Sequence, residues 1–346
     1  MKKSVKKVLA ILIAILLILI SLSASLLIIN KPKDRNDNTF IIVKIKEGSS
    51  TDDIAQELHK KGVISSVTKY KLVSKIWRYD GKYKAGSFSV SPSMRSSDIA
   101  QTIVKGVSST KNFTIPEGYT LEQTAEKLDK EGICNKEKFL DVAKNGDFSK
   151  FSFLKDAQSG DNHLEGYLYP DTYAVDLDAD ETQIITTMLN QYDKVFTKKY
   201  RQRAKELNLS ENEIVIIASL IERESQYDGD RAKIASVIYN RIKANMPLQI
   251  DATIQYALGK PKENLSIADT KIDSPYNTYT NQGLPPGPIC SPCKASIKAA
   301  LYPESTDYLY YVVSEKLDGT HNFSKDYSQF LKDKEAYSKA LAEKNK

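Results

Sequence analysis

The chain has 346 residues and a mass of 38.8 kDa, which suits two domains with a small additional module. Hydrophobic residues make up 41% and charged residues 27%, so collagen-like and wholly disordered classes are excluded. Four of the 50 basic residues are Lys2, Lys3, Lys6 and Lys7, and the remaining 46 stand against 44 acidic residues. The nearly neutral body lacks the basic stripe of a nucleic-acid-binding protein. Three cysteines, an odd count, argue against a disulfide scaffold.

The N-terminal segment predicts a single-pass membrane anchor. Residues 8–29 are apolar apart from three serines, carry no charge and can cross a hydrocarbon core of about 30 Å. The preceding lysines place residues 1–7 in the cytoplasm. A cleaved signal peptide is the alternative, although residues 26–29 extend the apolar run beyond the serines. Either way we expect the body to act outside the cytoplasm, at the cell membrane, without ATP, NAD or another cofactor.

After a polar linker at 30–39, strand–turn–helix patterns follow one another. Residues 40–64 and 113–134 each combine an alternating strand, a Glu-Gly turn and an amphipathic helix, and residues 88–106 repeat the pattern in shorter form. Thr120 to Gln123 has a capping-box pattern, and Ser50 to Asp53 has it in weaker form. Such units predict an α+β fold. We expect one subdomain at 40–110 and a connecting α+β region at 111–210. The repeated units either pack against each other or bind a ligand, and the pattern leaves both open.

Two helices are predicted over residues 211–246. The candidate catalytic group lies at the end of the first, which is apolar. On a helix, Glu224 lies beside Ile217, Leu220 and Ile221, whereas Glu222 lies on the smaller, more polar side. A carboxyl held against aliphatic side chains has a raised pKa and can act as a general acid near neutral pH. The alternative is that both glutamates belong to a solvated helix end.

Polar and aromatic loops follow this helix. Residues 248–253 and 276–279 supply amides, hydroxyls and rings, which suit the hydroxyl edges and C–H faces of sugars. Asp251 is either a second carboxylate in a groove or a loop or helix cap. Cys290 and Cys293 have CxxC spacing but no second pair, so two incidental thiols are favoured over a metal or redox site.

Six ordered segments resemble the endolytic murein transglycosylases of the YceG-like (MltG) family: EGYLYPDTY (165–173), ASLIERES (218–225), ASVIYNRI (235–242), LQIDATIQYALG (248–259), SPYNTYTNQGLPPGPI (274–289) and HNFS (321–324). The resemblance covers the whole chain. It implies a LysM-like subdomain over 40–110 and a lysozyme-like, mainly helical catalytic domain over 211–346. The CSPC segment at 290–293 departs from the family pattern.

The resemblance selects Glu224 as the catalytic acid. It implies cleavage of the bond between N-acetylmuramic acid and N-acetylglucosamine in nascent peptidoglycan strands. The cleavage gives 1,6-anhydro ends and ends elongation of the strand. The resemblance implies no metal or cofactor, and it implies cell-wall synthases as partners. The expected glycan-binding residues are Gln249, Asp251, Thr253, Tyr276, Asn277 and Tyr279. Two alternatives remain: an inactive, membrane-anchored peptidoglycan-binding protein, and a glycan hydrolase that uses Glu224, Asp251 and water.

Overall fold

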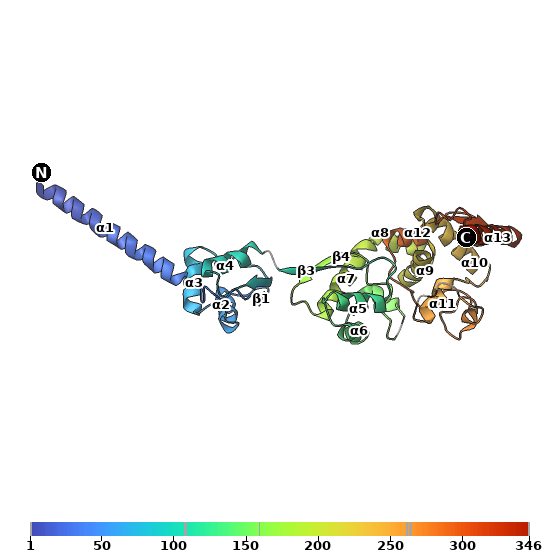
Figure 1. Ribbon diagram of the computed structural model, residues 1–346, viewed down its shortest axis with the longest axis horizontal. Coiled ribbons are helices and arrows are strands. Elements are labelled where there is room, and N and C mark those ends of the chain that lie inside the picture. Colours follow the sequence, from blue (N-terminus) through green and yellow to red (C-terminus); the bar gives the residue numbers. More distant parts are fainter. Residues whose placement is uncertain (1, 107–108, 159, 261, 263–264, 345–346) are drawn as a thin grey trace. The chain divides into compact units, whose positions relative to one another are not determined.

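The computed structural model describes residues 2–106, 109–158, 160–260, 262 and 265–344 (Figure 1). Over these residues the fold is mainly helical, with three two-stranded sheets, so the α+β expectation is confirmed at this level. The chain groups into two units. The first contains the residues up to 111 together with 174–179, and the second contains 112–173 and 180–346.

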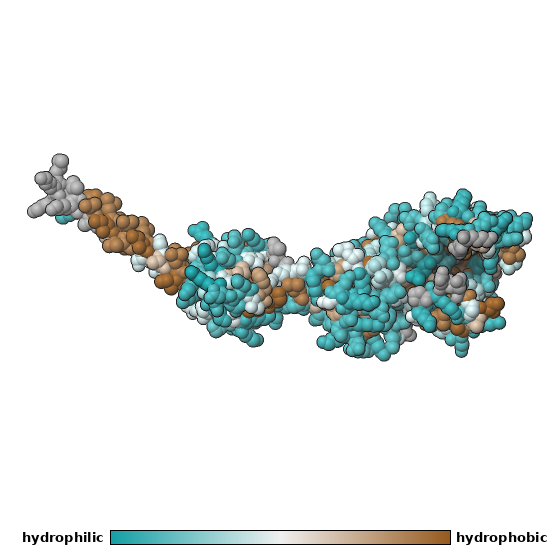
Figure 2. Space-filling view, in the orientation of Figure 1, coloured by the Kyte–Doolittle hydropathy of each residue, from teal (hydrophilic) through white to brown (hydrophobic). Residues whose placement is uncertain are grey.

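Helix α1 (Lys2–Ile29) contains the apolar run. Its segment Lys7–Ile29 has a mean hydropathy of 3.0, and none of it is buried within the protein. Figure 2 shows most of this part of α1 as apolar surface, interrupted by a paler stretch. Within the described residues this is the one helix long and apolar enough to cross a membrane, which is consistent with either an anchor or a signal sequence.

The first unit is built on strands β1 (Ile41–Ile45) and β2 (Gly86–Val90), which pair antiparallel with Val43 opposite Phe88. Helices α2 (Thr51–Lys60), α3 (Val67–Ile76) and α4 (Ser96–Lys105) complete it. Alternation along the strands and three-four spacing along the helices send their apolar side chains into one core. The Ser50–Asp53 capping box expected from the sequence is present at the start of α2.

The first half of the second unit packs helices around an aromatic cluster. Strands β3 (Thr110–Thr114) and β4 (Thr172–Asp176), each of which has residues in both units, pair with each other. The helical elements are α5 (Leu121–Lys130), α6 (Lys136–Asn145), η1 (Ser152–Asp156), α7 (Glu181–Val195) and α8 (Lys198–Glu206). Phe153, Tyr167 and Tyr192 make ring contacts in the core of this region. The predicted Thr120–Gln123 capping box begins α5.

The second half of this unit surrounds α9 (Glu211–Glu224), whose residues 214–221 are all buried. Helices α10 (Arg231–Lys243), α11 (Asp251–Ala257) and α12 (Lys294–Leu301) pack against it. Two short turns, η2 (Asp228–Asp230) and η3 (Asp269–Lys271), lie between them in the chain. Strands β5 (Tyr310–Val313) and β6 (His321–Ser324) pair antiparallel, and α13 (Tyr327–Lys344) packs on them.

Candidate active site

Helix α9 holds Glu224 at its C-terminal end. The helix begins with a reciprocal capping box between Ser210 and Glu213, which satisfies its first free N–H groups. Its apolar surface then packs against α10, α11 and α12. The helix ends at Glu224, and Ser225 leaves it with an extended backbone. Packing on three sides therefore fixes the position of the terminal carboxyl.

The Glu224 carboxyl is partly buried, and among the described residues one side chain donates a hydrogen bond to it. The hydroxyl of Tyr311 donates to Glu224 Oε2 at 2.9 Å. Burial raises the pKa of Glu224 to about 7; the Tyr311 hydrogen bond and Arg223 oppose this rise, and the negative charge of Asp251 adds to it. Part of the population is then protonated near neutral pH, as a general acid requires.

Glu222, the other candidate on α9, has a different environment. Its Oε2 accepts the backbone N–H of Cys293 at 2.9 Å and lies 3.4 Å from Arg231 Nη1. Only 7% of its side chain is exposed. An ion-paired, enclosed carboxylate of this kind holds the CSPC turn against α9.

Two of the predicted loop residues face the same region as Glu224. Asp251 is the first residue of α11, is exposed and accepts a hydrogen bond from the Tyr279 hydroxyl. The charge of Glu224 is among the groups that raise the pKa of Tyr279, after its burial and its contact with Asp251. The structure therefore brings Glu224, Asp251 and Tyr279 close enough for their charges to affect one another.

Gln249 stands in a strained backbone conformation. Its φ is +52°, a value that residues with side chains adopt rarely, while its side chain is exposed. Its N–H donates to Thr278 O at 3.0 Å. Arg241 supports the segment by donating to Leu248 O at 2.8 Å and also donates to Leu309 O, before β5, at 2.7 Å. Strain held by surrounding bonds is frequent at functional sites.

The other three predicted residues lie deeper or elsewhere. Thr253 is fully buried and hydrogen-bonded to Ile250 O and to Thr278. Asn277 is also fully buried and donates to two backbone carbonyls, of residues 270 and 272. Tyr276 donates its hydroxyl to Gln158, and its ring centroid lies 4.8 Å from that of Tyr256. The protein itself occupies the polar groups of Thr253 and Asn277, so these side chains have no free group for glycan.

Sequence reasoning missed Tyr311. It lies on β5, where it is the cross-strand partner of Phe323 in the HNFS segment. The hydrophobic strand that contains it has no polar residue to attract notice. Its pairing with the HNFS segment is seen only in the folded sheet, so the sequence around Tyr311 carries no signal of its role.

One group of side chains has the spacing of a metal site. Ligand atoms of Glu117, Glu222 and Cys293 lie within 4.8 Å of one another. The guanidinium of Arg231 already lies against Glu222, however, and the backbone N–H of Cys293 donates to the same carboxyl oxygen. Because protein groups occupy this carboxyl, we assign no metal here. Cys290 and Cys293 are both buried and are not joined by a disulfide.

A carboxyl at the end of a rigid helix, bonded to a tyrosine hydroxyl and beside loops rich in amides and hydroxyls, has the arrangement of a general acid–base site. Residues 43–336 match the YceG-like family, and the chain belongs to that family.

Named relatives agree over most of the chain. The endolytic murein transglycosylase of Bacillus subtilis is 35% identical over 333 residues, covering 91% of this chain and 89% of that protein. The endolytic murein transglycosylase of Streptococcus pneumoniae is 35% identical over 307 residues, covering 81% of this chain and 55% of that protein. A solved yceG-like protein from Listeria monocytogenes matches with a TM-score of 0.59 and 36% identity, covering 85% of this chain and 99% of that one.

Proposed function

We propose that this chain is an endolytic murein transglycosylase and that Glu224 is its catalytic acid. The family and the named relatives support the activity. The observation that supports the residue is the Glu224 carboxyl itself, whose pKa is raised by burial while one hydroxyl, that of Tyr311, orients it. Glu222, enclosed by Arg231 and Cys293, has no comparable freedom.

The reaction needs one carboxyl that acts twice. Protonated Glu224 gives its proton to the glycosidic oxygen between N-acetylmuramic acid and N-acetylglucosamine, and the bond from that oxygen to muramic C1 breaks. The acetamido group of the substrate stabilises the oxocarbenium-like transition state. The carboxylate of Glu224 then takes the proton of the muramic C6 hydroxyl, whose oxygen bonds to C1. The product has a 1,6-anhydro end, and water is not consumed.

The surrounding residues divide into two groups in this proposal. Gln249, Asp251 and Tyr279 stand where they can contact glycan, and Tyr311 orients the acid. Thr253 and Asn277 support the loops from within, because their fully buried side chains are bonded to protein groups. Half-buried Tyr276 packs on Tyr256 and bonds to Gln158, whereas Tyr279 faces Asp251 and Glu224. The direct contact with glycan that the sequence assigned to all six loop residues is thereby reduced to three of them.

We further propose a place and an arrangement for the enzyme. Helix α1 anchors the chain in the cell membrane with both units outside the cytoplasm, where peptidoglycan and its synthases lie. The paired strands β1 and β2 and the helices of residues 40–110 form the LysM-like subdomain. Residues 211–346 form the lysozyme-like catalytic domain. The exposed apolar surface of α1 and the packing of three helices around α9 support these assignments.

The experiment uses purified un-cross-linked glycan strands and mass spectrometry of the products. Wild-type protein is expected to give 1,6-anhydro ends, and Glu224→Gln is expected to lose about 10²–10⁴ in rate with an intact fold. Glu222→Gln is the matched control from the same helix. Reducing ends would identify a hydrolase, retention without cleavage would identify a binding protein, and full activity in Glu224→Gln would refute the choice of acid.

A further inference from the structure

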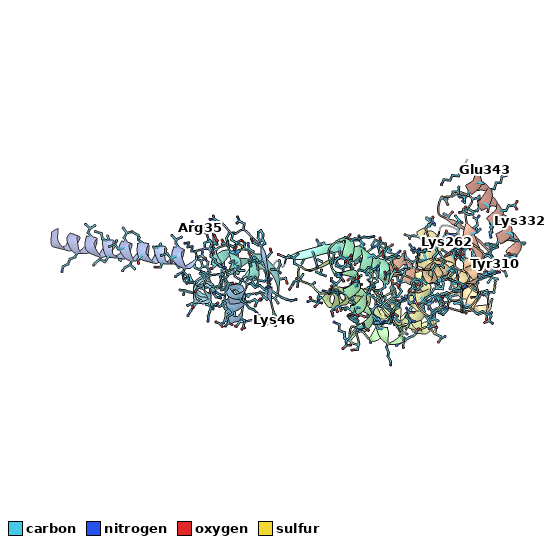
Figure 3. The ribbon with its side chains drawn as sticks, turned by 60° about the horizontal axis from the view of Figure 1, so that its bottom comes forward. Arg35, Lys46, Lys262, Tyr310, Lys332 and Glu343 are labelled. Carbon is cyan, nitrogen blue, oxygen red and sulfur yellow. The ribbon has the colours of Figure 1, made fainter. Side chains whose placement is uncertain are left out.

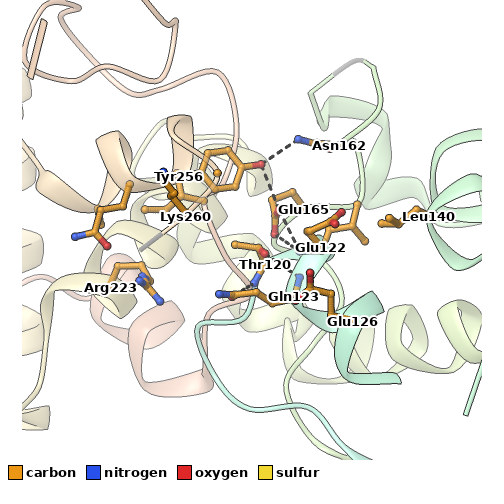
Figure 4. A pocket seen from close by; sticks show the side chains of 15 residues that line it. Thr120, Glu122, Gln123, Glu126, Leu140, Asn162, Glu165, Arg223, Tyr256 and Lys260 are labelled. Carbon is orange, nitrogen blue, oxygen red and sulfur yellow. Dashed lines mark hydrogen bonds between the residues drawn. The ribbon is translucent and has the colours of Figure 1, made fainter. Parts of the chain in front are cut away.

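Among the described residues outside α9, Glu165 and Asp230 are the buried acids. Glu165 accepts the backbone N–H of Leu121 and the hydroxyl of Tyr256, which Figure 4 shows beside it. These bonds tie the start of α5 to α11, so the role of Glu165 is to hold two helices together. Asp230 has a different kind of partner, the histidine of the HNFS segment, which has no part in the proposed reaction so far.

His321 and Asp230 form an enclosed pair. Their side chains are only 5% and 6% exposed, and His321 Nδ1 lies 3.2 Å from Asp230 Oδ2. The backbone N–H of His321 donates to the same oxygen at 2.7 Å. A carboxylate accepts hydrogen bonds and does not donate them, so the ring nitrogen that faces it carries a proton. The two contacts with one oxygen fix the start of β6 and the orientation of the imidazole ring.

The imidazole ring packs against Tyr311. In the register of β5 and β6, Tyr311 lies opposite Phe323, and His321 is on the same face of the sheet as Phe323. The ring centroids of His321 and Tyr311 are 5.6 Å apart and the ring planes meet at 86°, which is an edge-to-face contact. Phe323 lies beside both rings. The phenol whose hydroxyl donates to Glu224 therefore has the fixed imidazole as a direct neighbour.

The same pair also holds the segment that leaves the acid. Asp230 follows Glu224 by six positions, at the start of α10. Its backbone N–H donates to Tyr227 O at 3.0 Å, which closes the turn between the two helices. A closed path of contacts thus runs from Glu224 along the chain to Asp230, across to His321, on to Tyr311 and back to the carboxyl.

We propose that His321, held by Asp230, is a positioning residue for the catalytic acid and keeps the Tyr311 hydroxyl on the Glu224 carboxyl. The inference rests on the proposed function, since it concerns the same acid. Loss of the imidazole leaves space into which the phenol can tilt, and a hydrogen bond weakens steeply as its angle narrows. A weaker bond from Tyr311 favours the charged carboxylate less, so the carboxyl holds its proton to higher pH.

The experiment measures the pH at which kcat/KM for release of 1,6-anhydro ends falls. It also titrates the Glu224 carboxyl directly, by NMR of the full chain labelled at its glutamate carboxyls, which needs no substrate. His321→Asn keeps an amide donor for Asp230 but removes the ring beside Tyr311. We expect both midpoints to rise by about half a pH unit, and kcat at low pH to fall about threefold with KM unchanged. The other groups whose charges act on Glu224 or Tyr311 stay unchanged in this variant: Arg223, Arg241, Asp251 and Tyr279.

A matched control and a double variant separate positioning from general loosening of the sheet. Asn322→Ala changes the next residue of β6, which points to the opposite face and bonds to Glu315, and it should keep the wild-type midpoints. In Tyr311→Phe the hydroxyl is absent, so adding His321→Asn should move the midpoint no further. Asp230→Asn weakens the contact that holds the ring and should shift the midpoint in the same direction by a smaller amount.

Two results would overturn the inference. One is an unmoved midpoint in both His321→Asn and Asp230→Asn. The other is a shift from His321→Asn that is as large in the Tyr311→Phe background as in wild-type protein. If wild-type protein releases no 1,6-anhydro ends, the proposed function is refuted instead, and the NMR titration of Glu224 still decides whether His321 positions Tyr311.

Discussion

The hydroxyl of Tyr311 offers the sharpest test of how Glu224 is prepared for catalysis. Tyr311→Phe removes the one hydroxyl that donates to the carboxyl and leaves the ring in place. This bond favours the charged form of Glu224 and so lowers its pKa. The substitution must therefore raise that pKa further above its ordinary value.

The size of the shift follows from the strength of the bond. A hydrogen bond to a charged group contributes about 1.5–3 kcal/mol, and one pKa unit corresponds to about 1.36 kcal/mol. Because Glu224 keeps some contact with solvent, water replaces part of the lost interaction. We expect a rise of about one unit from the wild-type value of about 7.

The assay is the pH dependence of kcat/KM, measured by release of 1,6-anhydro ends between about pH 5 and 9. The protonated carboxyl is the active form, so wild-type activity should fall as pH rises through about 7. In Tyr311→Phe this fall should move upward by about one pH unit. The matched control is Tyr310→Phe, labelled in Figure 3, whose ring packs against Tyr327 and Phe330 and whose hydroxyl has no hydrogen bond to the described residues. An unmoved or downward-shifted fall in Tyr311→Phe would refute the assigned role.

Three further predictions concern stability and location. Burial raises the pKa of Glu165 to about 7, so the stability that this group contributes is largest below its ordinary pKa of 4.5 and is lost as pH rises through 7. Urea titrations should show the unfolding free energy declining by up to about 3 kcal/mol over this range, and Glu165→Gln should remove the decline. An unchanged decline in the variant would count against this role. Asn277→Ala should cost about 1–3 kcal/mol because it removes a fully buried amide that donates to two backbone carbonyls. Exposed Asp251→Asn should keep wild-type stability but lower activity, and the reverse pattern would exchange their roles. Removal of α1 should move the protein from the detergent phase to the aqueous phase on fractionation, and a mature wild-type chain already lacking it would identify a signal sequence.

Several features of this protein are determined by its local sequence. The apolar spacing of residues 214–221 predicts a buried helix, and the structure buries every one of these residues. The capping boxes at Ser50 and Thr120 begin helices where they were expected. The uncharged run near the N-terminus predicts a long apolar helix, and α1 is one. Each of these depends on residues within a few positions of one another, so periodicity and capping suffice to predict them.

The site depends on contacts between distant parts of the chain. Tyr311, which is 87 positions from Glu224, supplies the hydroxyl that orients the acid, and nothing in the sequence near either residue indicates it. Glu222 differs from Glu224 because Arg231 pairs with it and the backbone of Cys293 donates to it. Both partners come from other parts of the chain, so these contacts exist only in the folded protein. The burial of Asn277 could not be predicted from the sequence either. The local sequence of a polar loop does not indicate whether an Asn amide binds glycan or backbone carbonyls. Side-chain hydrogen bonds and desolvation are decided by tertiary packing, and those two effects set the pKa of a catalytic carboxyl.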